Sequence, residues 1–239
     1  MMSRDDGSFT ADVGEMDERV TKAWAPIMRK YAKPDSPEPE VDLFMAKYGR
    51  HIRSVPMVAS ELTGEGLRKR MMKMSVKTAT STDGWAVIDL RVLPADLWNM
   101  LAELLQAVED TGVWPRSLAE GFIALVPKGE GTGPLQMRPL SVLSTVYRIW
   151  AGFRLQDAMK WQELWIHKDA YGFRSKRGAM DAASVLQVLL EVTRAVKSTV
   201  AGYGLDYKKC YDLGPHAMSL ASAEAQGMHA GTLREAREM

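Results

Sequence analysis

Apolar residues recur at helical spacing in three stretches of the chain. Between residues 97 and 108 they stand at i, i+3, i+4, i+7, i+8 and i+11, and Gly112 is well placed to end that helix. Comparable spacing recurs over 142–153 and over 179–190. Each pattern predicts an amphipathic helix that packs its apolar stripe against a core.

Shorter apolar runs predict strands among these helices. "FIALVPK" (122–128) and "RPLSVL" (138–143) flank the glycine-rich segment "GEGTGPLQM", which together predict a β-hairpin. "AGYGLDY" (201–207) is expected to form a short buried strand, followed by a turn and a helix. The order of helices, hairpin, helices, strand and helix predicts a mixed α/β (α+β) chain.

Residues 1–74 are expected to be a poorly defined, partly disordered N-terminal extension. The first twenty residues are polar and acidic, and "KPDSPEPE" (33–40) is a proline-rich, charged linker. The pattern allows a short helix around 16–31, and "LRKRMMKM" (67–74) fits a basic amphipathic helix.

Composition narrows the class of protein without naming an activity. The 239 residues are 46% hydrophobic and 26% charged, which is ordinary for a globular protein. One cysteine excludes an intramolecular disulfide, and the four histidines are too scattered for a zinc site. No apolar run approaches the roughly 18 residues that span a bilayer, and the polar start is no secretory signal. We therefore expect a soluble intracellular protein, in the nucleus or the cytoplasm, with no membrane partner.

Charge is distributed unevenly in a chain whose net charge is +1. Residues 116–177 hold ten lysines and arginines against five aspartates and glutamates. This local excess weakly favours a polyanionic partner, and an ordinary solvated surface is the alternative.

Asp206 stands at the end of the strand expected at 201–207. A carboxylate held at a strand end suits a hard cation such as Mg²⁺, which takes one or two protein carboxylates and leaves other positions to water and phosphates. Alternatively, Asp206 caps the next turn by accepting backbone N–H groups. Asp212, before "LGP", has an equally plausible role in an Asx-turn.

Lys128 and Arg138 flank the glycine-rich turn of the expected hairpin. A hairpin would bring both cations to one side of its tip, where a lysine and an arginine suit a triphosphate and the glycines allow close backbone approach. No phosphate-binding P-loop pattern is present in the sequence. The alternative is a bare, mobile hairpin tip.

Three segments together resemble the reverse transcriptases of non-LTR retrotransposons, in that family's order. The first is the stretch from "TSTDGW" to "STVYRIW", with its "LVPK … RPLS" hairpin; it resembles the family's fingers. The second, "AYGFRSKRGAMDAASVL" (170–186), resembles the family's "GFR-x-x-R-x-x-x-D-A" element. The third, "GLDYKKCYDLGPH", resembles the first palm motif, a strand ending D-x-x-K-x-(F/Y)-D. The likeness covers about residues 78–218.

The resemblance implies a right-hand polymerase fold: fingers over 75–200 and a partial palm over 201–239. It implies two-metal nucleotidyl transfer with Mg²⁺, an RNA template, a DNA primer and deoxynucleoside triphosphates. The roles that it assigns are a metal ligand and catalytic carboxylate (Asp206), a backbone carbonyl on the same metals (Tyr207), an aromatic residue under the incoming sugar (Tyr211), phosphate contacts (Lys128, Arg138) and nucleic-acid backbone contacts (Arg174, Lys176, Arg177).

The sequence departs from the family at the second half of the metal site. No Y/F-A-D-D motif follows Asp212, and one carboxylate cannot hold two Mg²⁺ ions in working geometry. We therefore expect a truncated polymerase that is inactive by itself, with the missing palm segment possible in trans. The alternative is a non-catalytic nucleic-acid-binding module derived from polymerase fingers.

Overall fold

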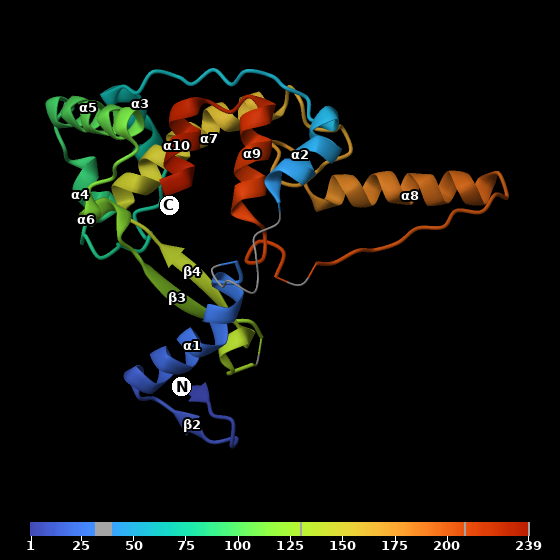
Figure 1. Ribbon diagram of the computed structural model, residues 1–239, viewed down its shortest axis with the longest axis horizontal. Coiled ribbons are helices and arrows are strands. Elements are labelled where there is room, and N and C mark those ends of the chain that lie inside the picture. Colours follow the sequence, from blue (N-terminus) through green and yellow to red (C-terminus); the bar gives the residue numbers. More distant parts are fainter. Residues whose placement is uncertain (32–39, 130, 208, 239) are drawn as a thin grey trace.

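The computed structural model describes residues 1–31, 40–129, 131–207 and 209–238. Helices dominate the described chain, and the two sheets are small antiparallel hairpins (Figure 1). This agrees with the mixed α/β class. The elements in chain order are β1 (Met2–Ser3), β2 (Phe9–Thr10), α1 (Val13–Met28), α2 (Val41–Tyr48), η1 (Gly49–His51), α3 (Gly64–Met72), α4 (Val87–Arg91), α5 (Ala95–Thr111), α6 (Arg116–Ala119), β3 (Phe122–Pro127), η2 (Pro134–Gln136), β4 (Met137–Val142), α7 (Thr145–Gln162), α8 (Ala179–Ala195), α9 (His216–Gln226) and α10 (Ala230–Glu238).

The core lies where α3, α4, α5 and α7 meet. Helix α5 was predicted correctly as a helix, and Gly112 ends it in the left-handed conformation that glycine adopts without steric cost (φ 79°). Its predicted stripe faces the core only in part: Leu105 and Val108 are buried, whereas Leu97, Met100 and Leu104 are exposed. Trp98 and Ala102 complete the face of α5 that packs against the core. Burying these apolar side chains contributes roughly 1.5–3 kcal/mol for each large one. The buried members are Leu62, Leu67, Met71, Val87, Leu90, Trp98, Ala102, Leu105, Val146, Ile149 and Trp150.

The N-terminal residues hold more structure than the sequence suggested. Leu67 and Met71 of α3 are fully buried in the core, so the boundary expected at residue 74 falls inside one packing unit. Nearer the N-terminus, α1 (Val13–Met28) overlaps most of the short helix expected around 16–31, and Asp12 caps it by accepting from the backbone N–H of Glu15. The expected linker 33–40 lies almost wholly outside the described residues.

Buried charges link α5 to α7. Arg154 donates to both carboxylate oxygens of Glu109 (2.6 and 2.7 Å) and to Asp157 (3.3 Å), and all three side chains are buried. Trp150 Nε1 also donates to Glu109 (2.6 Å), and Ser60 donates through its N–H and its hydroxyl to Asp157. Every charged side chain of the network has hydrogen-bond partners, which offset the free-energy cost of burying these charges away from water. The network therefore fixes how α5 and α7 pack.

The hairpin was predicted correctly. Strands β3 and β4 pair antiparallel, with Phe122 opposite Val142 and Val126 opposite Arg138. The pairing continues beyond the strand ends, because Lys128 N donates to Gln136 O (2.9 Å). In Figure 1 the hairpin projects from the helical body, with α1 beside its far end.

The prediction of a buried strand at 201–207 is wrong. These residues have no regular secondary structure and all are exposed. The apolar residues of this segment are typical of a strand, but no described strand lies beside it to pair with its backbone N–H and C=O groups. In Figure 1 the segment after α8 runs back from the end of that helix toward α9.

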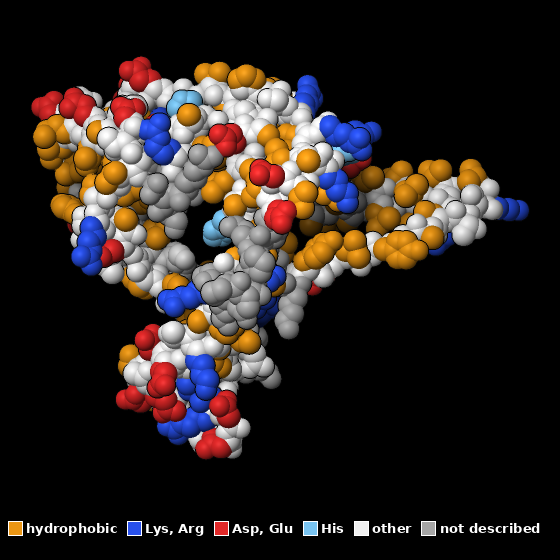
Figure 2. Space-filling model, viewed as in Figure 1, with side chains coloured by type: hydrophobic (Ala, Val, Ile, Leu, Met, Phe, Trp, Pro, Cys, Tyr) orange, Lys and Arg blue, Asp and Glu red, His pale blue; other side chains and the backbone are white. Residues whose placement is uncertain are grey.

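Helix α8 was predicted correctly as a helix, but its apolar stripe does not reach the core. Leu186, Leu189 and Leu190 are about half exposed, and Figure 2 shows apolar side chains along α8 and the returning segment. A contiguous exposed apolar face of this kind is unusual on a monomer.

Candidate nucleic-acid and nucleotide interface

The hairpin register places Lys128 and Arg138 on the same face. Directly opposed residues of an antiparallel pair share a face, and alternate residues along a strand do too. Arg138 opposes Val126, and Lys128 is two residues beyond Val126. Both cations are exposed. The hairpin therefore presents a lysine and an arginine as diagonal neighbours near its tip.

The opposite face of the hairpin is covered by α1. Leu125, Pro127 and Met137 of that face line an apolar cavity of about 840 Å³ together with α1 residues that include Met16 and Trp24. Because the cations lie on the other face, α1 does not cover them. The packing of α1 thus decides which face of the hairpin remains open.

Asp206, Tyr207 and Tyr211 lie in the exposed segment between α8 and α9. Tyr207 is 70% exposed and Tyr211 is 78% exposed. Tyr211 meets Phe173 edge to face, with ring centroids 6.1 Å apart. This contact brings the "GFR" turn next to the segment that contains Asp206. The side chain of Asp206 forms no hydrogen bond or ion pair with any described residue.

Arg174 is not free in the structure to contact a polyanion. It forms a two-pronged ion pair with Glu163 (2.9 and 2.5 Å), and its side chain is only 6% exposed. It also donates to the carbonyls of His167, Lys168 and Ala170 (3.2, 3.3 and 3.0 Å). The hydrogen bond from Arg174 lowers the pKa of Glu163 below its ordinary range. Arg174 therefore clamps the turn that follows α7.

Lys176 and Arg177 lie on the exposed side of the same turn. Arg177 donates to the carbonyl of Lys168 (2.8 Å), and its guanidinium lies 5.8 Å from the ring centroid of Tyr171. Lys176 has a positive φ of 59°, an uncommon conformation for a lysine. Among the three residues predicted to contact the nucleic-acid backbone, Lys176 and Arg177 are exposed to solvent.

The expected Mg²⁺ site is not assembled by the described residues. Within the ranges given above, no group of three or more histidine, cysteine, aspartate or glutamate side chains is positioned to hold a metal ion. Mg²⁺ demands near-octahedral oxygen coordination, to which Asp206 can supply one carboxylate. Asp206 and the carbonyl of Tyr207 would be the protein's contribution to such a site, and further ligands would have to come from elsewhere.

The sequence did not predict that α1 contacts both the hairpin tip and the segment after Asp206. Trp24 Nε1 donates to Pro134 O at the hairpin tip (3.1 Å), and Lys209 Nζ lies 3.6 Å from the centroid of the Trp24 ring. Tyr31 donates to Leu213 O (3.4 Å). Helix α1 thus joins the hairpin tip to the segment after Asp206. The one signal in the sequence was the helical pattern around 16–31.

Comparison with known protein families finds no family model that matches the chain. The resemblance to reverse transcriptases therefore rests on the three motifs. Among the described residues, no helix is both long enough and apolar enough to cross a membrane.

Proposed function

We propose that these residues are the fingers and the first palm motif of an RNA-directed DNA polymerase of the non-LTR retroelement type. The observation that carries the proposal is the register of β3 and β4. It sets Lys128 and Arg138 on one open face, which suits the phosphates of an incoming deoxynucleoside triphosphate. The Phe173–Tyr211 contact supports it, because two of the three motifs then meet in space.

In this proposal the 239 residues bind nucleotide and nucleic acid but do not extend a primer by themselves. Asp206 is the candidate catalytic carboxylate, Tyr211 the candidate sugar contact, and Lys176 and Arg177 the candidate template or primer contacts. Mg²⁺, when bound, would supply activation of the primer hydroxyl and charge stabilisation on the triphosphate. The remaining metal ligands would come from a palm segment outside these residues.

Titration with a deoxynucleoside triphosphate tests the phosphate contacts, with the matching deoxynucleoside as the probe that lacks phosphates. Removing one charge-assisted contact costs about 1.5–3 kcal/mol, so Lys128→Ala and Arg138→Ala should each weaken triphosphate binding at least tenfold. Lys69→Ala, in an exposed ion pair with Glu65 on α3, is the charge-matched control. Triphosphate binding that is unchanged in both hairpin variants would overturn the proposed contacts.

Primer extension on an RNA template with Mg²⁺ separates the polymerase from its alternative. The chain and its Asp206→Asn variant are both expected to give no product. Adding a palm segment in trans should restore extension to the wild-type chain but not to Asp206→Asn. Failure to restore it, with salt-sensitive template binding retained, would favour the non-catalytic binding module, because phosphate contacts weaken steeply with salt.

A further inference from the structure

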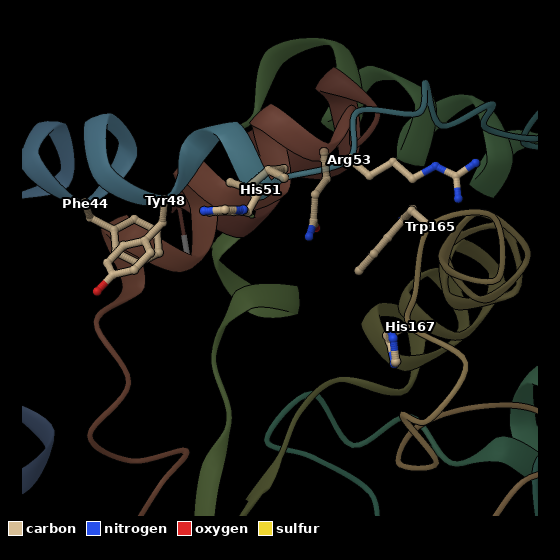
Figure 3. Close-up of a pocket in the computed structure, with 8 residues that line it drawn as sticks. Phe44, Tyr48, His51, Arg53, Trp165 and His167 are labelled. Atoms are coloured by element: carbon tan, nitrogen blue, oxygen red, sulfur yellow. The ribbon is translucent and has the colours of Figure 1, made fainter.

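A second candidate site lies away from the hairpin, between α2, η1 and the turn that follows α7. It is a cavity of about 440 Å³, within the size range of small-ligand sites. Figure 3 shows Phe44 and Tyr48 on one side of it, Trp165 and His167 on the other, and His51 between them. Arg53 extends over Trp165 in the same view.

The upper wall of the cavity is fixed by hydrogen bonds between distant parts of the chain. Val55 N donates to Gln226 O (2.8 Å) and Met57 N donates to Gly227 O (2.7 Å), which ties the segment after η1 to the end of α9. Gly227 is required here: its φ is 95°, and a Cβ would lie 2.5 Å from Val55 O. Trp161 Nε1 also donates to Val55 O (2.5 Å).

The opposite wall is fixed as well. Trp165 packs edge to face against Trp161, with ring centroids 5.2 Å apart. The carbonyl of His167 is held by Arg174 (3.2 Å). The aromatic and imidazole rings therefore stand on a preformed frame, which lowers the entropic cost of binding a ligand between them.

The residues that line the cavity define the chemistry of its ligand. Three are aromatic, Arg53 is cationic, and His51 and His167 add imidazole nitrogens, whereas no carboxylate lines it. Arg50 Nε donates to His51 Nε2 (3.2 Å), so a neutral His51 carries its proton on Nδ1 and can donate it. Asp169 is the nearby acid, 3.6 Å from His167 Nδ1. Flat rings beside hydrogen-bond donors suit a ligand that is both aromatic and anionic.

We propose that this cavity binds one unpaired nucleotide of a single-stranded nucleic acid. The base would stack on Tyr48 or Trp165, and the adjoining phosphate would be bound by Arg53 and the two histidines. A strand is favoured over a free nucleotide because basic residues continue outside the cavity. Lys47 Nζ lies 5.0 Å from the Tyr48 ring centroid, Arg50 is next to His51, and Figure 2 shows basic side chains over α2 and the segment after it.

Neither the hairpin nor Asp206 contributes to this site, so it can be tested apart from the proposed polymerase function. The probe is a fluorescently labelled ten-nucleotide single strand of uridines, followed by anisotropy at low and moderate salt. Loss of one stacked base or one phosphate contact should weaken binding about tenfold, so Tyr48→Ala and Arg53→Ala should each do so. Tyr48→Phe, which keeps the ring, should bind like the wild type.

Matched controls come from exposed residues elsewhere. Tyr203→Ala removes a tyrosine that is 96% exposed, and Arg68→Ala removes an exposed arginine of α3. Neither should change the affinity for the strand. Thermal unfolding of every variant confirms that the fold persists, and Arg53→Ala keeps the test valid if Tyr48→Ala unfolds the protein.

Three results would overturn the proposal. The first is unchanged strand binding in Tyr48→Ala and Arg53→Ala; a loss confined to Lys128→Ala and Arg138→Ala would leave the hairpin proposal standing alone. The second is uridine monophosphate binding as tightly as the strand, which would make this a free-nucleotide site. The third is equal displacement of the strand by polyglutamate of the same charge, because an acidic peptide uses the cations without the rings.

Discussion

Lys209 Nζ lies 3.6 Å from the centroid of the Trp24 ring, although the two residues belong to opposite ends of the chain. Lys209 occupies the lysine position of the D-x-x-K pattern that begins at Asp206. Trp24 is 5% exposed and also bonds the hairpin tip. A single buried tryptophan thus connects the two segments to which the resemblance assigns nucleotide and metal binding.

Replacing Trp24 should release the segment around Lys209. A cation–π contact of this kind contributes about 0.5–2 kcal/mol, so Trp24→Ala should increase tryptic cleavage after Lys209 severalfold. Trp24→Phe keeps a ring face and loses only the hydrogen bond to Pro134, so its cleavage should lie between the two. Cleavage after Lys197 is the internal control. Equal cleavage after Lys209 in all three proteins would show that the contact does not hold the segment.

The buried network should dominate the response to substitution in the core. Arg154→Met leaves Glu109 and Asp157 buried without their cation, which should lower the free energy of unfolding by about 3–5 kcal/mol. Arg116→Met makes the same change in an exposed ion pair and should lower the free energy of unfolding far less, because water and salt screen that pair. Denaturant unfolding measures both, and similar losses would contradict the role assigned to the network.

Arg174 should behave as a structural clamp rather than as a nucleic-acid contact. Arg174→Lys keeps the charge but cannot reproduce the forked pairing with Glu163, so amide hydrogen exchange over 163–174 should accelerate. Lys176→Ala should leave exchange unchanged and weaken binding to a polyanion. Unaltered exchange in Arg174→Lys would contradict the structural clamp and would favour the nucleic-acid contact that the resemblance implies for Arg174.

The stability of the N-terminal hairpin and α1 should depend on pH through Glu15. Arg4 forms a two-pronged hydrogen bond with Glu15 (2.6 Å each), which lowers the pKa of Glu15 from 4.5 to about 2. Because the folded-state pKa is depressed, the stabilisation is complete above pH 4.5 and is lost as the pH falls through about 2. The difference in unfolding free energy between the wild type and Glu15→Gln should therefore shrink across that window. A difference that is constant with pH would contradict this.

The exposed face of α8 should govern self-association. Leu186→Glu and Leu190→Glu together place charges on side chains that are 56% and 47% exposed. Sedimentation velocity should show less association in this double variant, with the unfolding temperature unchanged. Leu105→Glu, at a fully buried position, should instead unfold the protein. A large fall in unfolding temperature for the α8 variant would mean that this face is packed in solution.

The helices and the hairpin were predictable because their signals are local. The α5 stripe, the Gly112 end and the paired runs around "GEGTG" each specify an element from a few neighbouring residues. The same logic failed at 201–207, where a strand-like sequence has no described strand beside it. Sequence hydrophobicity cannot supply a hydrogen-bonding neighbour.

The sequence by itself determined the long helices α5, α7 and α8, where the hairpin turns, and which residues carry the resemblance to a polymerase. Only the tertiary structure decided that Arg174 is engaged by Glu163, that α1 covers one hairpin face and leaves Lys128 and Arg138 open, and that Phe44 and Trp165 share a cavity. The physical reason is range. Helical periodicity and turn chemistry act over a few residues, whereas these contacts join side chains that are neighbours only after the chain has folded.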